Sequence, residues 1–263
     1  MKHLLRRLWR LTRLVLHLVW GVWLILRHGR CDEHGNPLPE YAEVIRRWNR
    51  RALDILRVEV HSEGKPVTET ALWVANHISW LDIPLIAHVA PVAFLAKAEI
   101  AHWPLVGFLA RRSGTLFIER GARDGANRAL EQITWHLVRG RSVMVFPEAT
   151  TSDGRQVRRF HPRLFAAARL AHCPIQPVAI RYPGPDGQPD RRVAFIDGDT
   201  ALGSLWRILA LERVRAELHF CPAIRDTERE RRELAEMAWQ CVREHIEMGA
   251  TEPRPHSQDH KKG

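Results

Sequence analysis

The stretch NHISWLD, residues 76–82, places two side chains that can move a proton five positions apart. His77 and Asp82 would point about 140° apart on an α-helix and would face opposite sides of a β-strand. They can therefore meet only where the chain turns between them. A carboxylate that accepts a hydrogen bond from one imidazole nitrogen fixes the ring tautomer and leaves the other nitrogen as a base. Such a pair could take a proton from a hydroxyl group.

The surroundings of this motif favour a functional role. The apolar run 71–75 predicts a strand that ends just before Asn76, and a helical pattern resumes after Asp82. α/β proteins place their ligands at the carboxyl ends of strands, where helices begin. The chain has no GxSxG motif, so the hydroxyl would belong to the substrate rather than to a serine of the protein. A structural histidine at a helix start is the competing interpretation of this motif taken alone.

Three further stretches carry polar side chains next to predicted strands. In RRSGTLFIERGARDG, residues 111–125, Arg120 follows a strand and lies in a glycine-rich loop, where a cation suits a phosphate. In SVMVFPEATTSDGR, residues 142–155, Glu148 follows a strand and opens a polar loop. In IQPVAI, residues 175–180, Pro177 predicts an edge strand or a bulge. A solvated arginine, a turn glutamate and an ordinary edge strand are the simpler interpretations.

Taken together and in this order, the four stretches resemble the sequence blocks of the glycerolipid acyltransferase family, the lysophosphatidate acyltransferases. The resemblance covers about residues 55–222. The matching residues, block by block, are Asn76, His77 and Asp82; Gly114, Phe117, Ile118 and Arg120; Phe146, Pro147, Glu148, Ala149, Thr150, Thr151 and Ser152; and Ile175 to Val178. Lys97 and Pro104 match a segment between the first two blocks.

The resemblance implies a membrane-bound O-acyltransferase. His77, oriented by Asp82, would act as general base on the free hydroxyl of a lysolipid, most simply 1-acyl-glycerol-3-phosphate. The alkoxide would attack the thioester of acyl-CoA or acyl-carrier protein, without a covalent acyl-enzyme, a cofactor or a metal. The remaining matched residues would bind the acceptor: Arg120 and Lys97 at its phosphate, with Gly114, Glu148, Ala149, Thr150 and Thr151 shaping the site.

Two positions depart from the family pattern. Ala149 stands where the family has glycine, which adds a Cβ where the backbone needs a positive φ or a close approach. Thr151 stands where the family has arginine, and threonine cannot replace a guanidinium that clamps a phosphate with two hydrogen bonds. Either Arg155, Arg158 or Arg159 compensates, or the acceptor is another lysolipid. Family branches that act on lyso-ornithine lipid tolerate threonine here, which makes that lipid the alternative acceptor.

Charge and the N-terminal sequence point to a membrane surface. The chain of 263 residues has a formal net charge of +10 and ten tryptophans, and indole rings prefer the water–lipid interface. Residues 1–30 predict a basic amphipathic helix that anchors the protein to a membrane, on the cytoplasmic face of a bacterial inner membrane. A signal peptide is the competing interpretation, but no small-residue cleavage site follows. The sequence has no nucleic-acid-binding motif, so the rival function is that of a non-catalytic, basic membrane-binding protein.

The order of apolar runs predicts an α/β fold with a mixed, largely parallel sheet flanked by helices, preceded by the N-terminal helical membrane-binding segment. One of the expected strands covers residues 193–197. We expect a linker and amphipathic helix at 31–54, the acyltransferase domain at 55–225, a C-terminal helix at 226–249 and a disordered tail at 250–263. The four scattered cysteines predict reduced thiols, without a disulfide framework or a metal site.

Overall fold

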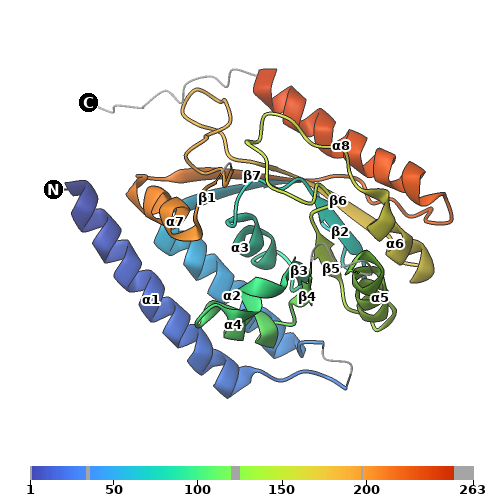
Figure 1. Ribbon diagram of the computed structural model, residues 1–263, viewed down its shortest axis with the longest axis horizontal. Coiled ribbons are helices and arrows are strands. Elements are labelled where there is room, and N and C mark those ends of the chain that lie inside the picture. Colours follow the sequence, from blue (N-terminus) through green and yellow to red (C-terminus); the bar gives the residue numbers. More distant parts are fainter. Residues whose placement is uncertain (1, 34–35, 120–124, 197, 252–263) are drawn as a thin grey trace, which may run out of the picture.

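A seven-stranded sheet in the order β1-β7-β6-β2-β5-β3-β4 forms the centre of the molecule (Figure 1). The computed structural model describes residues 2–33, 36–119, 125–196 and 198–251. Neighbouring strands are parallel except for β6 and β7, which pair antiparallel. The strands are β1 (Val58–Glu63), β2 (Leu72–Ala75), β3 (Ala93–Lys97), β4 (Leu116–Ile118), β5 (Val143–Val145), β6 (Ile175–Arg181) and β7 (Val214–Phe220).

Helices cover both faces of this sheet, and each face has its own hydrophobic core. One core packs side chains of α2, α3 and α7 against the sheet, and the other packs those of α5, α6 and α8. The α-helices are α1 (Lys2–His28), α2 (Pro39–Leu56), α3 (Asp82–Ala87), α4 (Val106–Arg112), α5 (Gly125–Val138), α6 (Ala166–Leu170), α7 (Ala201–Ala210) and α8 (Arg231–Thr251), with short 3-10 helices η1 (Ala98–His102) and η2 (Pro162–Phe165). The predicted fold class is confirmed.

Strand β2 shows why the sequence forms this arrangement. Its side chains alternate between the two cores: Trp73 and Ala75 pack in one, while Leu72 and Val74 pack in the other. All four are buried, because a strand covered by helices on both faces needs apolar residues at every position. The carboxyl end of this central strand is therefore fixed from both sides. That end carries Asn76 and His77.

Two expectations about strands are wrong. Pro177 does not mark an edge, because β6 lies between β2 and β7. The missing N–H of Pro177 is tolerated since antiparallel pairing with β7 begins only at the next residue, where Val178 pairs with Phe220. The described part of the expected strand 193–197 is a loop. Its backbone forms hydrogen bonds with the side chain of Arg207 and with the carbonyl of Ile78, and it pairs with no strand.

Helix α1 runs along the outside of the molecule and is held by its polar side (Figure 1). Arg6 and Arg10 donate to backbone carbonyls at the end of α7 and just beyond it. His17 stacks on Trp48 of α2 with ring centroids 4.5 Å apart, and the Trp48 indole N–H donates to the His17 carbonyl at 3.2 Å. Gly21 lets the two helices approach, because a Cβ at this position would collide with the Trp48 ring.

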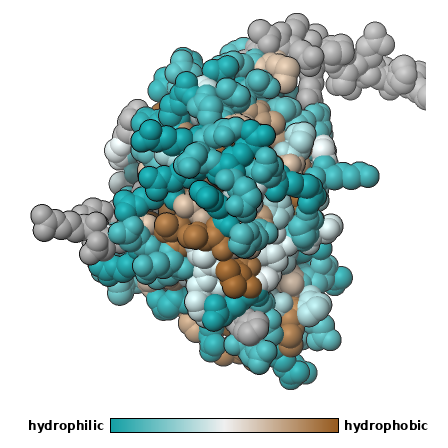
Figure 2. Space-filling model, turned by 90° about the vertical axis from the view of Figure 1, so that its right-hand side faces the viewer, coloured by the Kyte–Doolittle hydropathy of each residue, from teal (hydrophilic) through white to brown (hydrophobic). Residues whose placement is uncertain are grey.

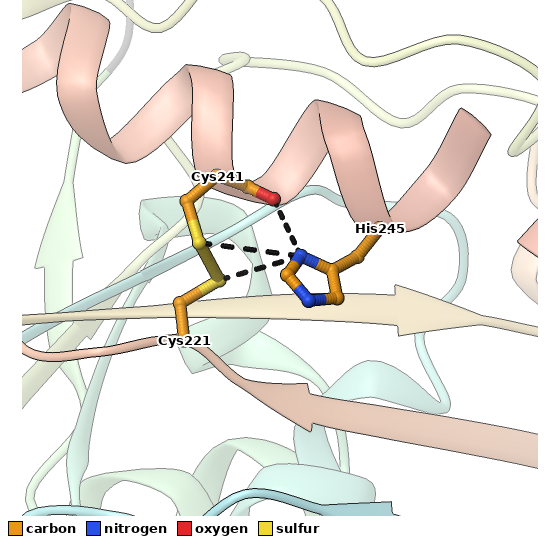
Figure 3. A group of neighbouring side chains, drawn as sticks. All are labelled: Cys221, Cys241 and His245. Carbon is orange, nitrogen blue, oxygen red and sulfur yellow. Dashed lines mark hydrogen bonds between the residues drawn. A yellow bond between two sulfur atoms is a disulfide. The ribbon is translucent and has the colours of Figure 1, made fainter. Parts of the chain in front are cut away.

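Helix α8 is tied to the sheet by a disulfide between Cys241 and Cys221, the residue that follows β7 (Figure 3). The expectation of reduced thiols is therefore wrong for these two cysteines, while Cys31 and Cys173 are free. Sequence spacing could not reveal the pair, because only the packing of α8 on the sheet brings the two residues together. His245 lies beside the bridge, with Nδ1 4.0 Å from each sulfur.

Reduction of this disulfide should lower the stability of the fold. The bridge closes a loop with a sequence separation of 20 residues, and closing a loop of about 20 residues stabilises a protein by about 3 kcal/mol through the unfolded state. We expect dithiothreitol and Cys241→Ser each to lower the midpoint of thermal unfolding, without an additive effect. Cys31→Ser is the matched control. Four free thiols in the denatured, unreduced protein would contradict the pairing.

Candidate active site

The chain turns between His77 and Asp82 and brings the two side chains together. Asp82 begins α3, and its backbone N–H donates to the Ser79 carbonyl at 3.1 Å, which closes the turn. His77 Nδ1 lies 2.7 Å from Asp82 Oδ2. The same oxygen accepts the backbone N–H groups of Ile78 at 2.8 Å and Ser79 at 3.0 Å. The spacing that fits neither helix nor strand is thus the spacing of this turn.

The carboxylate of Asp82 has no exposed surface and is hydrogen-bonded on both oxygens. Its Oδ1 accepts the hydroxyl of Tyr182 at 2.7 Å, and Tyr182 is itself 2% exposed. Burial raises the pKa of the Tyr182 phenol well above its ordinary value, so this group is a neutral donor. Sequence reasoning missed Tyr182, because it lies 100 residues from Asp82 and no local pattern signals the contact.

Asn76 joins the end of β2 to β6. Its side-chain amide donates to the Ile180 carbonyl at 2.9 Å, and its side-chain carbonyl accepts the Ile180 N–H at 2.8 Å. The amide completes the ladder where β2 has ended, so the next residue, His77, leaves the sheet at a fixed point. The asparagine of the motif is therefore a structural residue that aims the histidine.

The imidazole of His77 is held but accessible. The ring stacks on Phe146 with centroids 4.0 Å apart and planes 13° apart. The side chain keeps 21% of its surface exposed, in contrast to the fully buried Asp82. Because Nδ1 faces the carboxylate, Nε2 is the nitrogen left to act on a substrate.

Glu148 supports the backbone on both sides of the site. Its Oε1 accepts the His77 N–H at 2.7 Å, and its Oε2 accepts the Arg158 N–H at 2.9 Å. Burial raises the pKa of this carboxyl to about 7, against the opposing effect of these two hydrogen bonds. The predicted acceptor-site residue thus lies directly behind the catalytic turn, where it fixes the loop that follows β5.

Thr151 fastens this loop to the 193–196 segment. Its hydroxyl donates to the Phe195 carbonyl, and the Phe195 N–H donates to the Ile78 carbonyl at 2.9 Å. The segments after β2, β5 and β6 are thereby joined next to His77. Thr150 is exposed on the same loop.

Lys97 and Gly114 lie at opposite ends of the paired strands β3 and β4. Lys97 is exposed at the carboxyl end of β3, in register with Ile118 of the parallel β4. Gly114 has a φ of +79°, and a Cβ there would collide with the guanidinium of Arg141. Gly114 therefore serves the packing of the backbone. Arg120 lies outside the described residues.

Ala149 occupies the conformation that glycine adopts most easily. Its φ is 60°, in a turn closed by its own N–H and the Phe146 carbonyl at 3.2 Å. The left-handed conformation costs an L-residue roughly 1–2 kcal/mol, which glycine avoids at the expense of greater freedom in the unfolded chain. The sequence therefore predicted correctly where the backbone would need a positive φ.

Ala149→Gly should stabilise the protein. We expect the free energy of unfolding to rise by up to about 1 kcal/mol, because relief of the left-handed strain exceeds the added chain entropy. Chemical denaturation measures the change. Ala171→Gly is a control with ordinary backbone angles, since Ala171 has a φ of −94°, and it should be neutral or destabilising. A less stable Ala149→Gly protein would show that the Cβ of Ala149 contributes contacts that outweigh the strain.

Among the described residues, Cys221, Cys241 and His245 bring three potential metal ligands within 4.8 Å of one another. The thiolate is the form that binds a metal, and here the two sulfurs are bonded to each other. Cys221 donates its N–H to Pro177 in the first half of β6, whereas Asn76 binds Ile180 near its end. This group is separate from the catalytic turn.

The turn holds an accessible imidazole against a buried carboxylate, an arrangement that could take a proton from a hydroxyl group of a substrate. Comparison with known proteins identifies the family. Residues 57–181 match the Acyltransferase family. The chain is 42% identical to the lyso-ornithine lipid O-acyltransferase of Pseudomonas aeruginosa, over 91% of this chain and 92% of that protein. The chain belongs to this acyltransferase family, and it is an acyltransferase.

Two further comparisons agree. The chain is 34% identical to the 1-acyl-sn-glycerol-3-phosphate acyltransferase of Neisseria gonorrhoeae, over 82% of each protein. Its fold matches the crystal structure of the 1-acyl-sn-glycerophosphate acyltransferase PlsC from Thermotoga maritima, with a TM-score of 0.72 over 97% of this chain and 98% of that one, at 24% identity. The resemblance stated from the four sequence blocks is confirmed.

Proposed function

We propose that this protein transfers an acyl chain from a thioester to the free hydroxyl of a lysolipid, and that lyso-ornithine lipid is its acceptor. The observation that carries the reaction type is the His77–Asp82 pair at 2.7 Å, with Nε2 on the accessible side of the ring. The relative from Pseudomonas aeruginosa, which has that acceptor in its name, matches nearly the whole chain.

The reaction follows from the geometry in two steps. His77 Nε2 takes the proton of the lipid hydroxyl, and Asp82 stabilises the imidazolium that forms. The alkoxide oxygen attacks the carbonyl carbon of acyl-CoA or acyl-carrier protein, the new C–O bond forms, and the C–S bond breaks. The imidazolium returns its proton to the departing thiolate. His77 ends in its starting state, and no covalent acyl-enzyme or cofactor is needed.

The headgroup side of the site favours a zwitterionic acceptor over a phosphate. The position at which the family has arginine is Thr151, and its hydroxyl is committed to Phe195. Arg159 cannot substitute freely, because it forms an ion pair with Glu236 and lies 3.7 Å from the ring of Trp239. A phosphate thus finds no guanidinium at position 151 or from Arg159, whereas an ornithine headgroup carries a single carboxylate and an ammonium.

Lysophosphatidate is the second candidate acceptor. Lys97 stands at the same end of the sheet as His77, and Arg158 is exposed on the loop that Glu148 holds. Two cations at these places suit a phosphate. The relative from Neisseria gonorrhoeae, named for that acceptor, shares 34% of the aligned residues.

An acceptor panel tests the proposal. The purified full-length enzyme receives labelled acyl-CoA, or acyl-carrier protein, with lyso-ornithine lipid, lysophosphatidate or another lysophospholipid in mixed micelles. We expect kcat/KM to be at least tenfold higher for lyso-ornithine lipid. His77→Ala should lower transfer at least a thousandfold with the fold intact by circular dichroism. A preference for lysophosphatidate would select the second candidate, and an active His77→Ala protein would disprove the mechanism.

We also propose that α1 lies flat in the membrane interface instead of crossing the bilayer. By length and composition alone, the segment Leu4–His28 of this helix is long and apolar enough to cross a membrane. One side of the helix, however, packs against the domain: Arg10 binds the end of α7, and His17 and Gly21 pack against Trp48 of α2. The opposite side is an exposed apolar stripe of Leu4, Leu5, Leu8, Trp9, Val15, Leu16, Val19, Trp20, Trp23 and Leu26.

The rest of the surface supports this orientation. The side of the molecule seen in Figure 2, where α5, α6 and α8 lie, is mainly hydrophilic and carries only a limited hydrophobic patch. The N-terminal segment contains arginines and lysine but no acidic residue before Asp32. Basic interfacial helices bind anionic leaflets, and this supports the proposal of a location on the cytoplasmic face of a bacterial inner membrane.

Charges in the apolar stripe should release the protein from membranes. We expect the double substitution Leu16→Glu and Trp23→Glu to weaken binding to vesicles of phosphatidylethanolamine and phosphatidylglycerol at least tenfold, with little change in the unfolding midpoint, because both side chains are more than half exposed. Leu170→Glu on α6, at 57% exposure, is the matched control. Vesicle flotation measures binding. Undiminished flotation of the double variant would place the membrane contact elsewhere.

A further inference from the structure

Among the described residues, Tyr182 is the hydrogen-bond partner of the Asp82 carboxylate that comes from outside the turn between His77 and Asp82. We propose that Tyr182 is a positioning residue that shares the charge of Asp82 and thereby weakens the attraction of Asp82 for a protonated His77. The proposal rests on the proposed function, because it assigns a role within the same proton transfer.

The two carboxylate oxygens of Asp82 have different hydrogen-bond partners. Oδ2 accepts from His77 Nδ1 and from the backbone of Ile78 and Ser79, so the turn itself fixes this oxygen. Oδ1 accepts the Tyr182 hydroxyl at 2.7 Å. Without that hydroxyl, a carboxylate oxygen would face an interior with no exposed surface. Its charge would then be concentrated on the bonds at Oδ2.

Contacts of both the backbone and the ring of Tyr182 fix the position of its hydroxyl. Tyr182 follows β6 directly, and its carbonyl accepts the Asp190 N–H at 2.8 Å. Its ring is buried in the core that also contains Ile78 and Leu81, which belong to the catalytic turn. A neutral phenol fixed in this way can donate to Asp82 but cannot swing toward the substrate.

The expected effect of removing the Tyr182 hydroxyl follows from the negative charge of Asp82. Hydrogen bonds to a carboxylate spread its negative charge and weaken its attraction for a further proton donor. Removal of the phenol leaves more charge on the oxygen that faces His77. The imidazolium is then more stable, and a larger fraction of the enzyme at neutral pH is protonated and inactive. Because the backbone of Ile78 and Ser79 still holds Oδ2, the carboxylate keeps its place.

Other ionisable groups around the pair must be considered in a pH experiment. Glu148 contacts the His77 backbone, and Arg158 lies near Glu148 on the same loop. Asp153, Arg181 and Asp190 line a small hollow beside Tyr182. Their contributions are common to the wild type and to a variant that removes only the phenolic oxygen, so the comparison of the two isolates the effect of Tyr182.

The chain provides a matched control. It has two tyrosines, and Tyr41 is equally buried at 2% exposure, with its hydroxyl donating to the Arg112 carbonyl at 3.1 Å. Each Tyr→Phe substitution therefore removes one buried phenolic hydrogen bond. We expect Tyr182→Phe to move the acid limb of the kcat/KM profile to higher pH. Activity at pH 7 should fall about tenfold and recover toward the wild-type level at pH 9. Tyr41→Phe should leave the shape of the profile unchanged.

The outcomes separate positioning from simple stability. A Tyr182→Phe enzyme that loses activity equally at every pH, or whose acid limb stays or moves to lower pH, would overturn the proposal. An equal shift in Tyr41→Phe would also do so, because that hydroxyl lies outside the site.

A spectroscopic experiment works even if the acceptor is misidentified. In the Tyr41→Phe protein, the Cζ resonance of 13C-labelled tyrosine comes from Tyr182 alone. We expect this resonance to shift with pH as His77 titrates, and to lose that response in Tyr41→Phe/His77→Ala, which retains Glu148. A response that survives the loss of His77 would disprove the coupling. Coupling without acyl transfer to any acceptor would disprove the proposed function and keep the role of Tyr182.

Discussion

A carboxylate without exposed surface is stable as an anion only if hydrogen bonds replace its water, and Asp82 obtains four such bonds. The catalytic geometry depends on this requirement. Two of the donors are backbone N–H groups, which force the chain to turn after β2, and a third is Tyr182, which directly follows the neighbouring strand β6. The fourth is the imidazole, so the same bonds that keep the charge buried also aim His77.

Helix α1 reverses the usual arrangement of an amphipathic helix. Its buried side chains include Arg10 and His17, while leucines and tryptophans face outward. The guanidinium groups of Arg6 and Arg10 find hydrogen-bond acceptors here, because the last carbonyls of α7 have no partner within the helix. The outward face makes physical sense if its solvent is lipid. On the proposed orientation, one helix would serve both as a cap for the end of α7 and as the surface that meets the bilayer.

Local features of the site could be predicted from the sequence, and contacts between distant segments could not. The turn between His77 and Asp82, the positive φ of Ala149 and the layered fold follow from spacing, from side-chain geometry and from resemblance. The contact of Tyr182 with Asp82, the central place of Pro177 and the Cys221–Cys241 bridge depend on which strands become neighbours. The apolar run 193–197 predicts a strand by its sequence, yet in the described part the side chain of Arg207 binds the backbone in place of a neighbouring strand.

The hydrogen bonds of α1 also fix the distance between this helix and the His77 imidazole. Arg6 and Arg10 hold α1 to the end of α7, Arg207 of α7 holds the carbonyl of Ala194, and the neighbouring Phe195 binds Ile78 beside His77. With α1 in the interface, the imidazole sits at a fixed elevation above the bilayer, because no flexible linker intervenes. A fixed height of the imidazole would let the enzyme distinguish acceptors by the position of their hydroxyl relative to the membrane surface. Such an enzyme would favour a hydroxyl that the lipid presents at the depth of the imidazole, in addition to a matching headgroup.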